Sequence, residues 1–180
     1  MAFDVNQFRT QLIGDGARPN LFEAQVQFPN YVSLGGVAGA KSRFLIKAAQ
    51  LPGSTIGIVP LQYFGREVKL AGNRTYQDWT IQIINDEDFV IRKAMEQWIN
   101  GLNDPVRNVR IAQAEVVDGG YGTDALITHF GKTGDVIKTY QIIGMFPVDV
   151  SPIEVDWAAN DTIEEFTVTL AFQYWIDPTL

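Results

Sequence analysis

Apolar and polar residues alternate with a period of two through most of this 180-residue chain. The clearest segment alternates Phe166, Val168, Leu170, Phe172 and Tyr174 with Glu165, Thr167, Thr169, Ala171 and Gln173. Successive side chains of a β-strand point to opposite faces, so this segment predicts a strand with one dry and one wet face. Residues 22–28 and 79–83 repeat the pattern. The predicted fold is mainly antiparallel β, because antiparallel sheets commonly have one buried and one solvated face.

Three further segments predict strands: residues 66–70, 125–130 and 136–143. Residues 131–135, Gly-Lys-Thr-Gly-Asp, have turn composition, so 136–143 is expected to return antiparallel to 125–130 as a hairpin. No internal repeat, low-complexity tract or linker is evident, and we expect a single domain over 1–180.

Residues 88–102 break this period. Their apolar positions, Ile91, Ala94, Met95, Trp98 and Leu102, have the spacing of a helix with one buried stripe. We predict a helix over 85–103, begun at Asn85 or Asp86 and ended by Gly101 or by the Asn-Asp-Pro step at 103–105. Its stripe could bind a partner, but we favour one packed helix that covers the sheet, as amphipathic helices usually do.

Residues 1–20 are expected to form an N-terminal arm, in which Asp4 caps a short helix bearing Phe8 and Leu12. The start has neither a basic leader nor an apolar run, so we expect no secretory signal and folding in the cytosol. No segment reaches the roughly 20 apolar residues of a membrane helix, and no membrane partner is expected.

Two segments, residues 29–42 and 51–60, predict loops because they are rich in Gly and Pro. The second loop and its continuation are unusually apolar, with Ile56, Ile58, Val59, Leu61, Tyr63 and Phe64. Such residues need a cover, since loops normally face water. Either they fold back on their own domain or a neighbouring subunit buries them.

The segment 35–42, Gly-Gly-Val-Ala-Gly-Ala-Lys-Ser, comes close to a phosphate-binding loop. Ala40 stands where the motif needs its second glycine, and neither a preceding parallel strand nor a following helix is predicted. We therefore favour a flexible loop without a nucleotide.

Candidate catalytic and metal-binding groups are few. The chain has one histidine, His129, and no cysteine, which excludes thiolate sites, disulfides and histidine clusters. Glu164 and Glu165 are adjacent on a strand and point to opposite faces, so they cannot flank one substrate. Residues 86–88, Asp-Glu-Asp, suit a helix start better than a calcium loop. No catalytic residue, cofactor or metal site is predicted.

Long strings of residues resemble the tail tube protein of contractile-tailed, T-even-like bacteriophages. They are KAAQLPGSTIG at 47–57, YFGREVKLAG at 63–72, TYQDWT at 75–80 and INDEDF at 84–89. Residues 15–22, DGARPNLF, and 163–166, IEEF, also resemble that family. The similarity covers nearly the whole chain, and residues 112–134 are the least similar part.

This resemblance implies a structural virion protein. The protomer would be an antiparallel β-sandwich or barrel whose sheets join into a ring-wide β-barrel, and hexameric rings would stack into the tube through which DNA is ejected. Implied partners are other copies of the chain, the tail sheath protein, the baseplate, the tape measure protein and the tail terminator. The tube would belong to the virion and be assembled in the host cytoplasm, without catalysis or a cofactor.

Two surfaces are predicted on this basis. The expected subunit interface contains Pro52, Gly53, Ile56, Ile58, Tyr63 and Phe64. The expected lumen-facing residues are Thr80, Gln82, Glu165, Thr167, Thr169 and Gln173. The chain has 14 basic and 21 acidic residues, a net charge of -7, which suits a conduit that lets DNA pass without binding it.

Two alternatives remain open from sequence. The same kind of tube could serve a contractile bacteriocin or a type VI-like injection apparatus that carries no genome. A β-rich module that binds a carbohydrate or small ligand is also compatible with the composition, and would show an exposed cluster of aromatic side chains.

Overall fold

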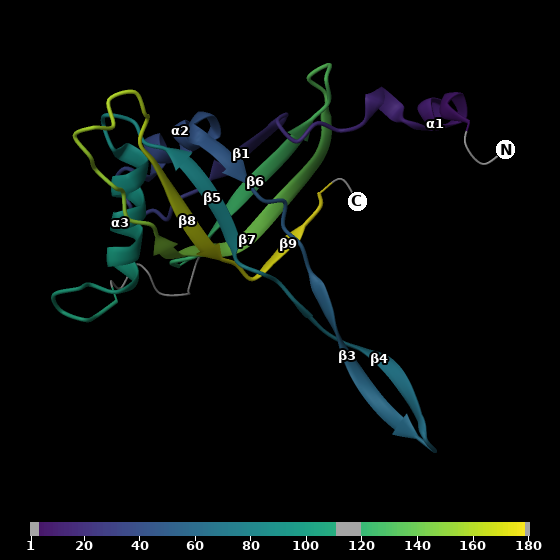
Figure 1. The fold of residues 1–180 in the computed structure, drawn as a ribbon. Helices are drawn as coiled ribbons and strands as arrows, with labels where there is room; N and C mark the ends of the chain where they lie inside the picture. Colours follow the sequence, from purple (N-terminus) through teal and green to yellow (C-terminus); the bar gives the residue numbers. More distant parts are fainter. Residues whose placement is uncertain (1–3, 111–119, 179–180) are drawn as a thin grey trace.

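The computed structural model describes residues 4–110 and 120–178. A seven-stranded antiparallel sheet has the order β1-β6-β7-β8-β5-β2, with β9 paired to β7, and β3 and β4 form a separate hairpin (Figure 1). The strands are β1 (Phe22–Val26), β2 (Ile46–Ala49), β3 (Thr55–Tyr63), β4 (Arg66–Thr75), β5 (Trp79–Ile84), β6 (Thr123–Phe130), β7 (Val136–Val150), β8 (Glu165–Ala171) and β9 (Tyr174–Ile176). The helices are α1 (Val5–Gln11), the 3₁₀ turn η1 (Ile13–Asp15), α2 (Gly35–Leu45) and α3 (Val90–Leu102).

Strand β7 joins two groups of strands in the sheet, β1, β6 and β9 on one side and β8, β5 and β2 on the other. Its first part pairs with β6 and with β9, whereas its last part, from Phe146 onward, pairs with β8. Gly144 lies at a register shift near the end of the part that pairs with β6, with a φ of 64°, a conformation that glycine adopts without strain. The sheet can therefore bend at this point, so that both groups of strands face one core.

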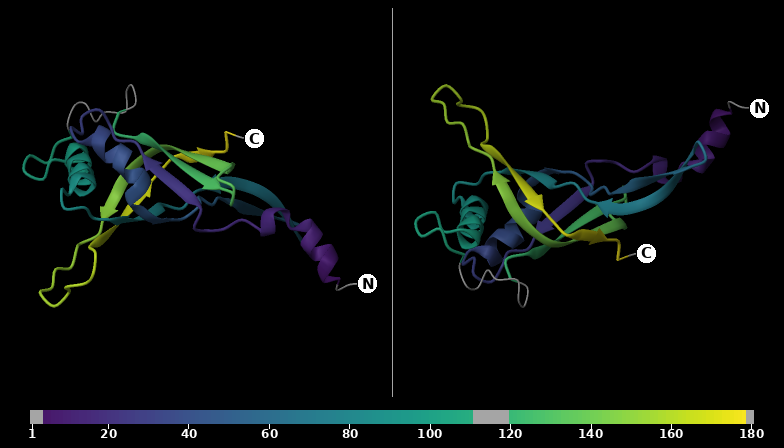
Figure 2. Two further views of the ribbon diagram at one scale, coloured as in Figure 1. Left: turned by 90° about the horizontal axis from the view of Figure 1, so that it is seen from above. Right: turned by 90° about the horizontal axis from the view of Figure 1, so that it is seen from below.

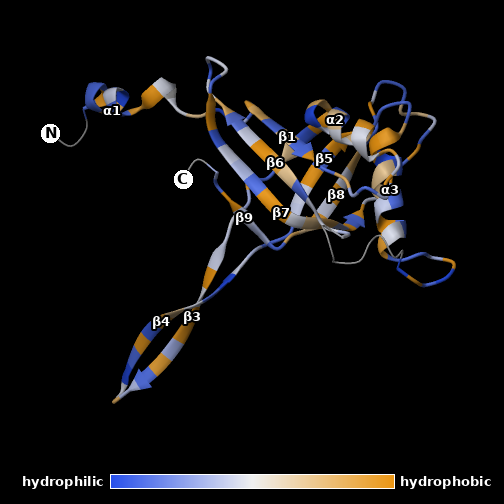
Figure 3. Ribbon diagram, turned by 180° about the vertical axis from the view of Figure 1, so that it is seen from behind, coloured by the Kyte–Doolittle hydropathy of each residue, from blue (hydrophilic) through white to orange (hydrophobic). Residues whose placement is uncertain are grey.

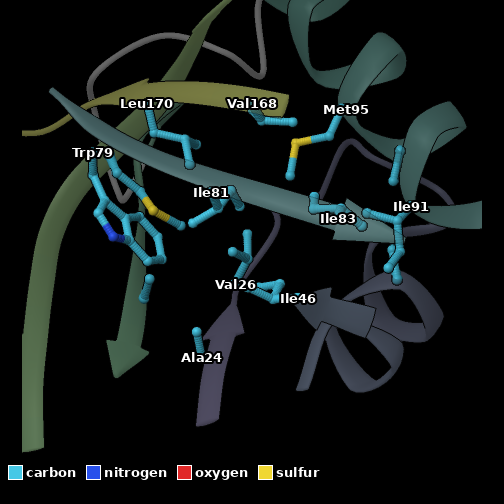
Figure 4. Packing of buried hydrophobic residues seen from close by; sticks show 14 of the residues in the cluster. Ala24, Val26, Ile46, Trp79, Ile81, Ile83, Ile91, Met95, Val168 and Leu170 are labelled. Carbon is cyan, nitrogen blue, oxygen red and sulfur yellow. The ribbon is translucent and has the colours of Figure 1, made fainter. Parts of the chain in front are cut away.

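The core is built from the dry faces that the alternation predicts. Ile81 and Ile83 of β5 and Val168 and Leu170 of β8 lie in one buried cluster with Met95 of α3 (Figure 4). Their neighbours in sequence lie on the other face and stay partly exposed. The mainly antiparallel β prediction is confirmed, as are the strands expected at 66–70, 79–83, 125–130 and 136–143, whereas the strand expected over 22–28 ends at Val26.

Helix α3 covers this core, as predicted, and buries Ile91, Ala94, Met95 and Trp98. It begins at Val90 rather than at residue 85, because Phe89 has left-handed backbone (φ 55°) and cannot continue a helix. The side chain of Asp88, not that of Asn85 or Asp86, accepts the N–H of Val90. The short helix α1 is capped by Asp4, as expected, and buries none of its residues.

A second packed helix, α2, occupies a segment that we predicted to be a loop. Its buried residues are small: Gly35, Ala38, Gly39 and Ser42. A side chain at Gly39 would lie 3.0 Å from the carbonyl oxygen of Val26, so the glycine lets α2 approach β1 closely. The hydroxyl of Ser42 accepts the N–H of Val26 at 3.1 Å. Tertiary packing therefore outweighs the poor helix propensity of glycine.

The loop predicted at 51–60 is also wrong, because most of it lies in β3 of the β3–β4 hairpin. Phe64 and Gly65 turn the hairpin with φ of 44° and 78°, the positive values that tight hairpin turns require. Pro60 is tolerated because both strands of a two-stranded ribbon are edge strands.

The strand predicted to reach Tyr174 stops at Ala171. The N–H of Gln173 then donates to the carbonyl oxygen of Ile143 at 3.1 Å, and the chain continues as β9 along β7. The change of partner strand ends the regular alternation before Gln173.

Two tryptophans provide a matched test of the core. Trp98 is fully buried, packs on Phe28 with ring centroids 5.4 Å apart, and donates its indole N–H to the carbonyl oxygen of Tyr121. Trp157 is 100% exposed. Trp98→Ala should lower the free energy of unfolding by about 3–5 kcal/mol, and Trp157→Ala should change it by less than about 0.5 kcal/mol. Denaturant titration of the purified protein measures both, and equal effects would contradict this core.

Two helical glycines provide a second test. A Cβ on Gly101 would lie 2.1 Å from the ring of Tyr31, whose hydroxyl donates to the carbonyl oxygen of Trp98, whereas a Cβ on Gly36 meets nothing within 4 Å. Gly101→Ala should lower the free energy of unfolding by about 1–3 kcal/mol. Gly36→Ala should raise it by up to about 1 kcal/mol, since alanine favours the helix. The same titration checks both, and stabilisation by Gly101→Ala would contradict the packing of Tyr31.

Candidate assembly surfaces

The β3–β4 hairpin projects away from the main sheet (Figures 1 and 3). Every residue of its two strands is exposed except the half-buried Gly72. Cross-strand pairing places Val59, Leu61 and Tyr63 on the same face as Leu70, Val68 and Arg66. We call these six residues the hairpin face.

The apolar residues of this segment do not fold back on the domain. Between Ile56 and Phe64, the exposed fractions of the large apolar side chains run from 45% for Ile56 to 93% for Phe64. A lone two-stranded hairpin is marginally stable in water, and a contiguous exposed apolar patch commonly marks an interaction site. Of the two covers considered for this segment, the domain itself is therefore excluded.

The six predicted interface residues lie in different places. Tyr63 and Phe64 form the tip, with ring centroids 4.7 Å apart, while Ile58 lies on the face opposite Tyr63. Pro52 and Gly53 precede β3, and the carbonyl oxygen of Gly53 accepts the indole N–H of Trp175 at 3.4 Å. The hairpin thus brings together four of the six, on two faces.

Five of the six predicted lumen residues form one polar face on β5 and β8. Thr80 pairs with Thr169 and Gln82 with Thr167 across the two strands. The carboxylate of Glu165 accepts from Gln82 at 2.7 Å and from Lys47 at 2.6 Å. The sixth, Gln173, lies beyond the end of β8 and outside this row.

The segment that resembles a phosphate-binding loop forms the body of α2. The ammonium of Lys41 binds the carboxylates of Asp86, at 2.8 Å, and Asp88. Hydrogen bonds to Asp86 and Asp88 raise the pKa of Lys41, and the bond from Lys41 lowers the pKa of Asp88. Lys41 therefore ties α2 to the start of α3.

The remaining candidates for chemistry are separated. Glu164 accepts from the amide of Asn85 at 2.6 Å, on the side opposite the pairs made by Glu165. His129 is half-buried on β6, where the strand register places it opposite Phe22 of β1 and Lys138 of β7. Within residues 4–110 and 120–178, no group of three or more His, Asp or Glu side chains is placed to hold a metal ion. No helix in the same part of the chain has the length and apolar character needed to cross a bilayer.

The β3–β4 hairpin and the connection between β7 and β8 leave large apolar side chains exposed. Comparison with known proteins gives the family to which the chain belongs. The sequence matches the family described as phage tail tube protein over residues 17–177. The chain belongs to this family. The tail tube protein of Enterobacteria phage T4 is 29% identical over 167 residues, which cover 90% of this chain and 92% of the T4 protein. The tail tube protein of Serratia phage KSP90 is 23% identical over 173 residues, 93% of each chain.

Solved structures of contractile injection systems share the fold. A chain in the structure of the anti-feeding prophage cap, a tube-terminating cap, matches with a TM-score of 0.62 at 15% identity over 89% of each chain. A chain of the sheath–tube complex of the extracellular contractile injection system PVC has a TM-score of 0.60 at 14% identity and covers 98% of each chain. The predicted resemblance, the fold class and the structural role as a tail tube protein are confirmed.

Sequence reasoning missed one conspicuous surface of this tail tube protein. The connection between β7 and β8, residues 151–164, has no periodic pattern, yet it exposes Trp157 completely. The available signal was a tryptophan surrounded by acidic residues in a segment with no predicted strand or helix.

The pair of Lys41 and Asp88 predicts a pH dependence. A carboxyl whose pKa is lowered in the folded state stabilises it above its ordinary pKa, and the stabilisation is lost as the pH falls through the lowered value. Asp88→Asn, which keeps an oxygen to cap α3, should therefore lower the free energy of unfolding near neutral pH, and the difference from wild type should vanish in acid. Denaturant titrations from neutral pH into acid measure this difference in the free energy of unfolding. Glu87→Gln, which removes the neighbouring carboxylate instead, is the control. A difference that persists in acid would contradict the pairing.

Proposed function

We propose that this chain builds the inner tube of a contractile phage tail by self-assembly into stacked hexameric rings, through which DNA is ejected into the host. The carrying observation is the hairpin face, an apolar surface that its own domain leaves uncovered. Burial of apolar surface is the dominant favourable term in most protein association, and neighbouring copies would supply it. Residues 1–180 would act as one domain with an arm at 1–20.

The sheet edges support closure into a ring. Strands β1 and β2 end the sheet path, and they have five and four residues. Unpaired strand edges are templates for pairing with another chain, and closure removes them. Joining such edges around six copies would give a ring-wide β-barrel.

The polar face of β5 and β8 is the surface proposed to line the lumen. It includes three threonines, a glutamine and Glu165, and the ammonium of Lys47 is paired to Glu165. A wall of this chemistry in a chain of net charge -7 would offer DNA no phosphate-binding surface. The role is non-catalytic and needs no cofactor.

Proposed partners follow from this role. The neighbour in the PVC sheath–tube complex supports a contractile sheath around the tube, and the anti-feeding prophage cap supports a terminating protein at its end. The baseplate and the tape measure protein complete the set. The tube would be assembled in the host cytoplasm and remain in the virion tail.

A tube that carries no genome is the second candidate. It is favoured by the same two neighbours, which come from injection systems. Genes for a capsid and a terminase beside this gene would indicate a phage, and their absence an injection particle.

Removing the hairpin tests the proposal. Thr55 pairs with Thr75, so a short Gly-Ser linker can replace residues 55–75 without moving the sheet. We expect wild type to form hollow tubes in negative-stain electron microscopy, and the deletion variant to stay a folded monomer by light scattering and circular dichroism.

A second variant keeps the hairpin and changes only the apolar side chains of the hairpin face. Val59, Leu61, Val68 and Leu70 are all replaced by threonine, which keeps β propensity and lowers apolarity. This variant should also fail to form tubes. Normal tubes from the deletion variant would show that the hairpin is not a subunit interface.

A further inference from the structure

The connection between β7 and β8 is an acidic loop, which we define as residues 151–164. Its carboxylates are Glu154, Asp156, Asp161 and Glu164, and it contains no Lys or Arg. Its tip exposes apolar side chains, with Trp157 100%, Val155 87% and Ile163 72% exposed. Tryptophan is strongly enriched among the residues that dominate binding energy at protein interfaces.

Local hydrogen bonds hold the tip in one conformation. The carboxylate of Asp156 accepts the N–H of Ala158 at 3.0 Å, and its carbonyl oxygen accepts the N–H of Ala159 at 3.1 Å. The N–H of Asn160 donates to the carbonyl oxygen of Ala158 at 3.0 Å. A preorganised tip loses less conformational freedom when it binds.

Three carboxylates of the acidic loop are available to bind a partner. Glu164 is held by Asn85, but no cation among residues 4–110 and 120–178 forms an ion pair with Glu154, Asp156 or Asp161. A complementary surface would present cations around an apolar patch.

The β3–β4 hairpin has that chemistry. It carries Arg66, Lys69 and Arg74 against a single carboxylate, Glu67, in a chain whose net charge is negative. Arg66 belongs to the hairpin face, whose apolar residues are 44–64% exposed, whereas Lys69 lies on the opposite face of the ribbon with its ammonium 4.0 Å from the carboxylate of Glu67. The hairpin therefore matches the acidic loop in both charge and apolarity.

The two surfaces lie on opposite sides of the subunit. The acidic loop, yellow-green, and the hairpin project in opposite directions in the view of Figure 1 and in both views of Figure 2. They cannot meet within one chain. Two different complementary patches on one protein give a heterologous contact, which builds rings or open stacks of copies.

We propose that the acidic loop of one copy docks on the β3–β4 hairpin of a second copy, with Trp157 against the hairpin face and the loop carboxylates toward Arg66. This contact rests on the proposed self-assembly and names a specific contact within it. Burial of Trp157 supplies affinity, and the charges fix the register and direction of the contact.

Charge reversal tests the pairing. The loop variant is Glu154→Lys with Asp161→Lys, which leaves the turn made by Asp156 intact. The hairpin variant is Arg66→Glu. Each should raise the critical concentration for tube formation, measured by sedimentation and electron microscopy, at least about tenfold. A chain with both reversals should regain tubes near the wild-type concentration.

Trp157→Ala should raise the critical concentration by a similar factor, and Val106→Ala, at a site 90% exposed elsewhere, should leave it unchanged. Because the chain has no cysteine, Trp157→Cys combined with Leu61→Cys should give covalent multimers on oxidation. Either single cysteine should give at most dimers.

The outcomes separate the two proposals. Loop variants that assemble like wild type overturn this contact and leave the proposed function standing. If those tubes no longer bind sheath protein, the loop belongs to the sheath interface instead. A wild-type chain that forms no tubes, alone or on added baseplates, overturns the proposed function and this contact together.

Discussion

Side chains of a β-strand must point alternately to opposite faces, and the architecture of β5 and β8 follows from that constraint. Ile81, Ile83 and Val168 enter a core that α3 covers, which forces Thr80, Gln82 and their partners onto the other face. A sheet with one dry face and one polar face is a suitable wall for a channel, because the subunit keeps its core while the polar face remains free for the lumen.

Three other surfaces of the chain are not covered by its own domain. The hairpin extends from the body with its apolar face uncovered, β1 and β2 end the sheet, and the acidic loop presents Trp157 to solvent. Each is unfavourable in an isolated subunit and favourable once another copy covers it. The proposed tube would account for all three, since each subunit in it would be surrounded by copies of itself.

Sequence predicts those elements whose burial depends on hydrophobic periodicity. The period of two locates β1, β5, β6 and β8, and the helical spacing from Ile91 to Trp98 locates α3. Helix α2 is not predicted because its buried side is glycine, alanine and serine, which leave no hydrophobic pattern. Strand β3 is not predicted because Gly57 and Pro60 interrupt the alternation. Gln173 is misplaced because the alternation continues in sequence while the chain changes partner strand. Faces of the hairpin require the register, which sequence does not provide.

In the proposed tube, a neighbouring copy covers the hairpin and the polar face of β5 and β8 turns inward. A cryo-electron microscopy reconstruction of tubes grown from the purified chain tests both features at once. We expect six copies per ring, Thr80, Gln82, Thr167 and Thr169 on the lumen, and Leu61 and Val68 buried by another copy. A map in which the hairpin faces solvent and the polar face is buried away from the lumen would contradict this arrangement.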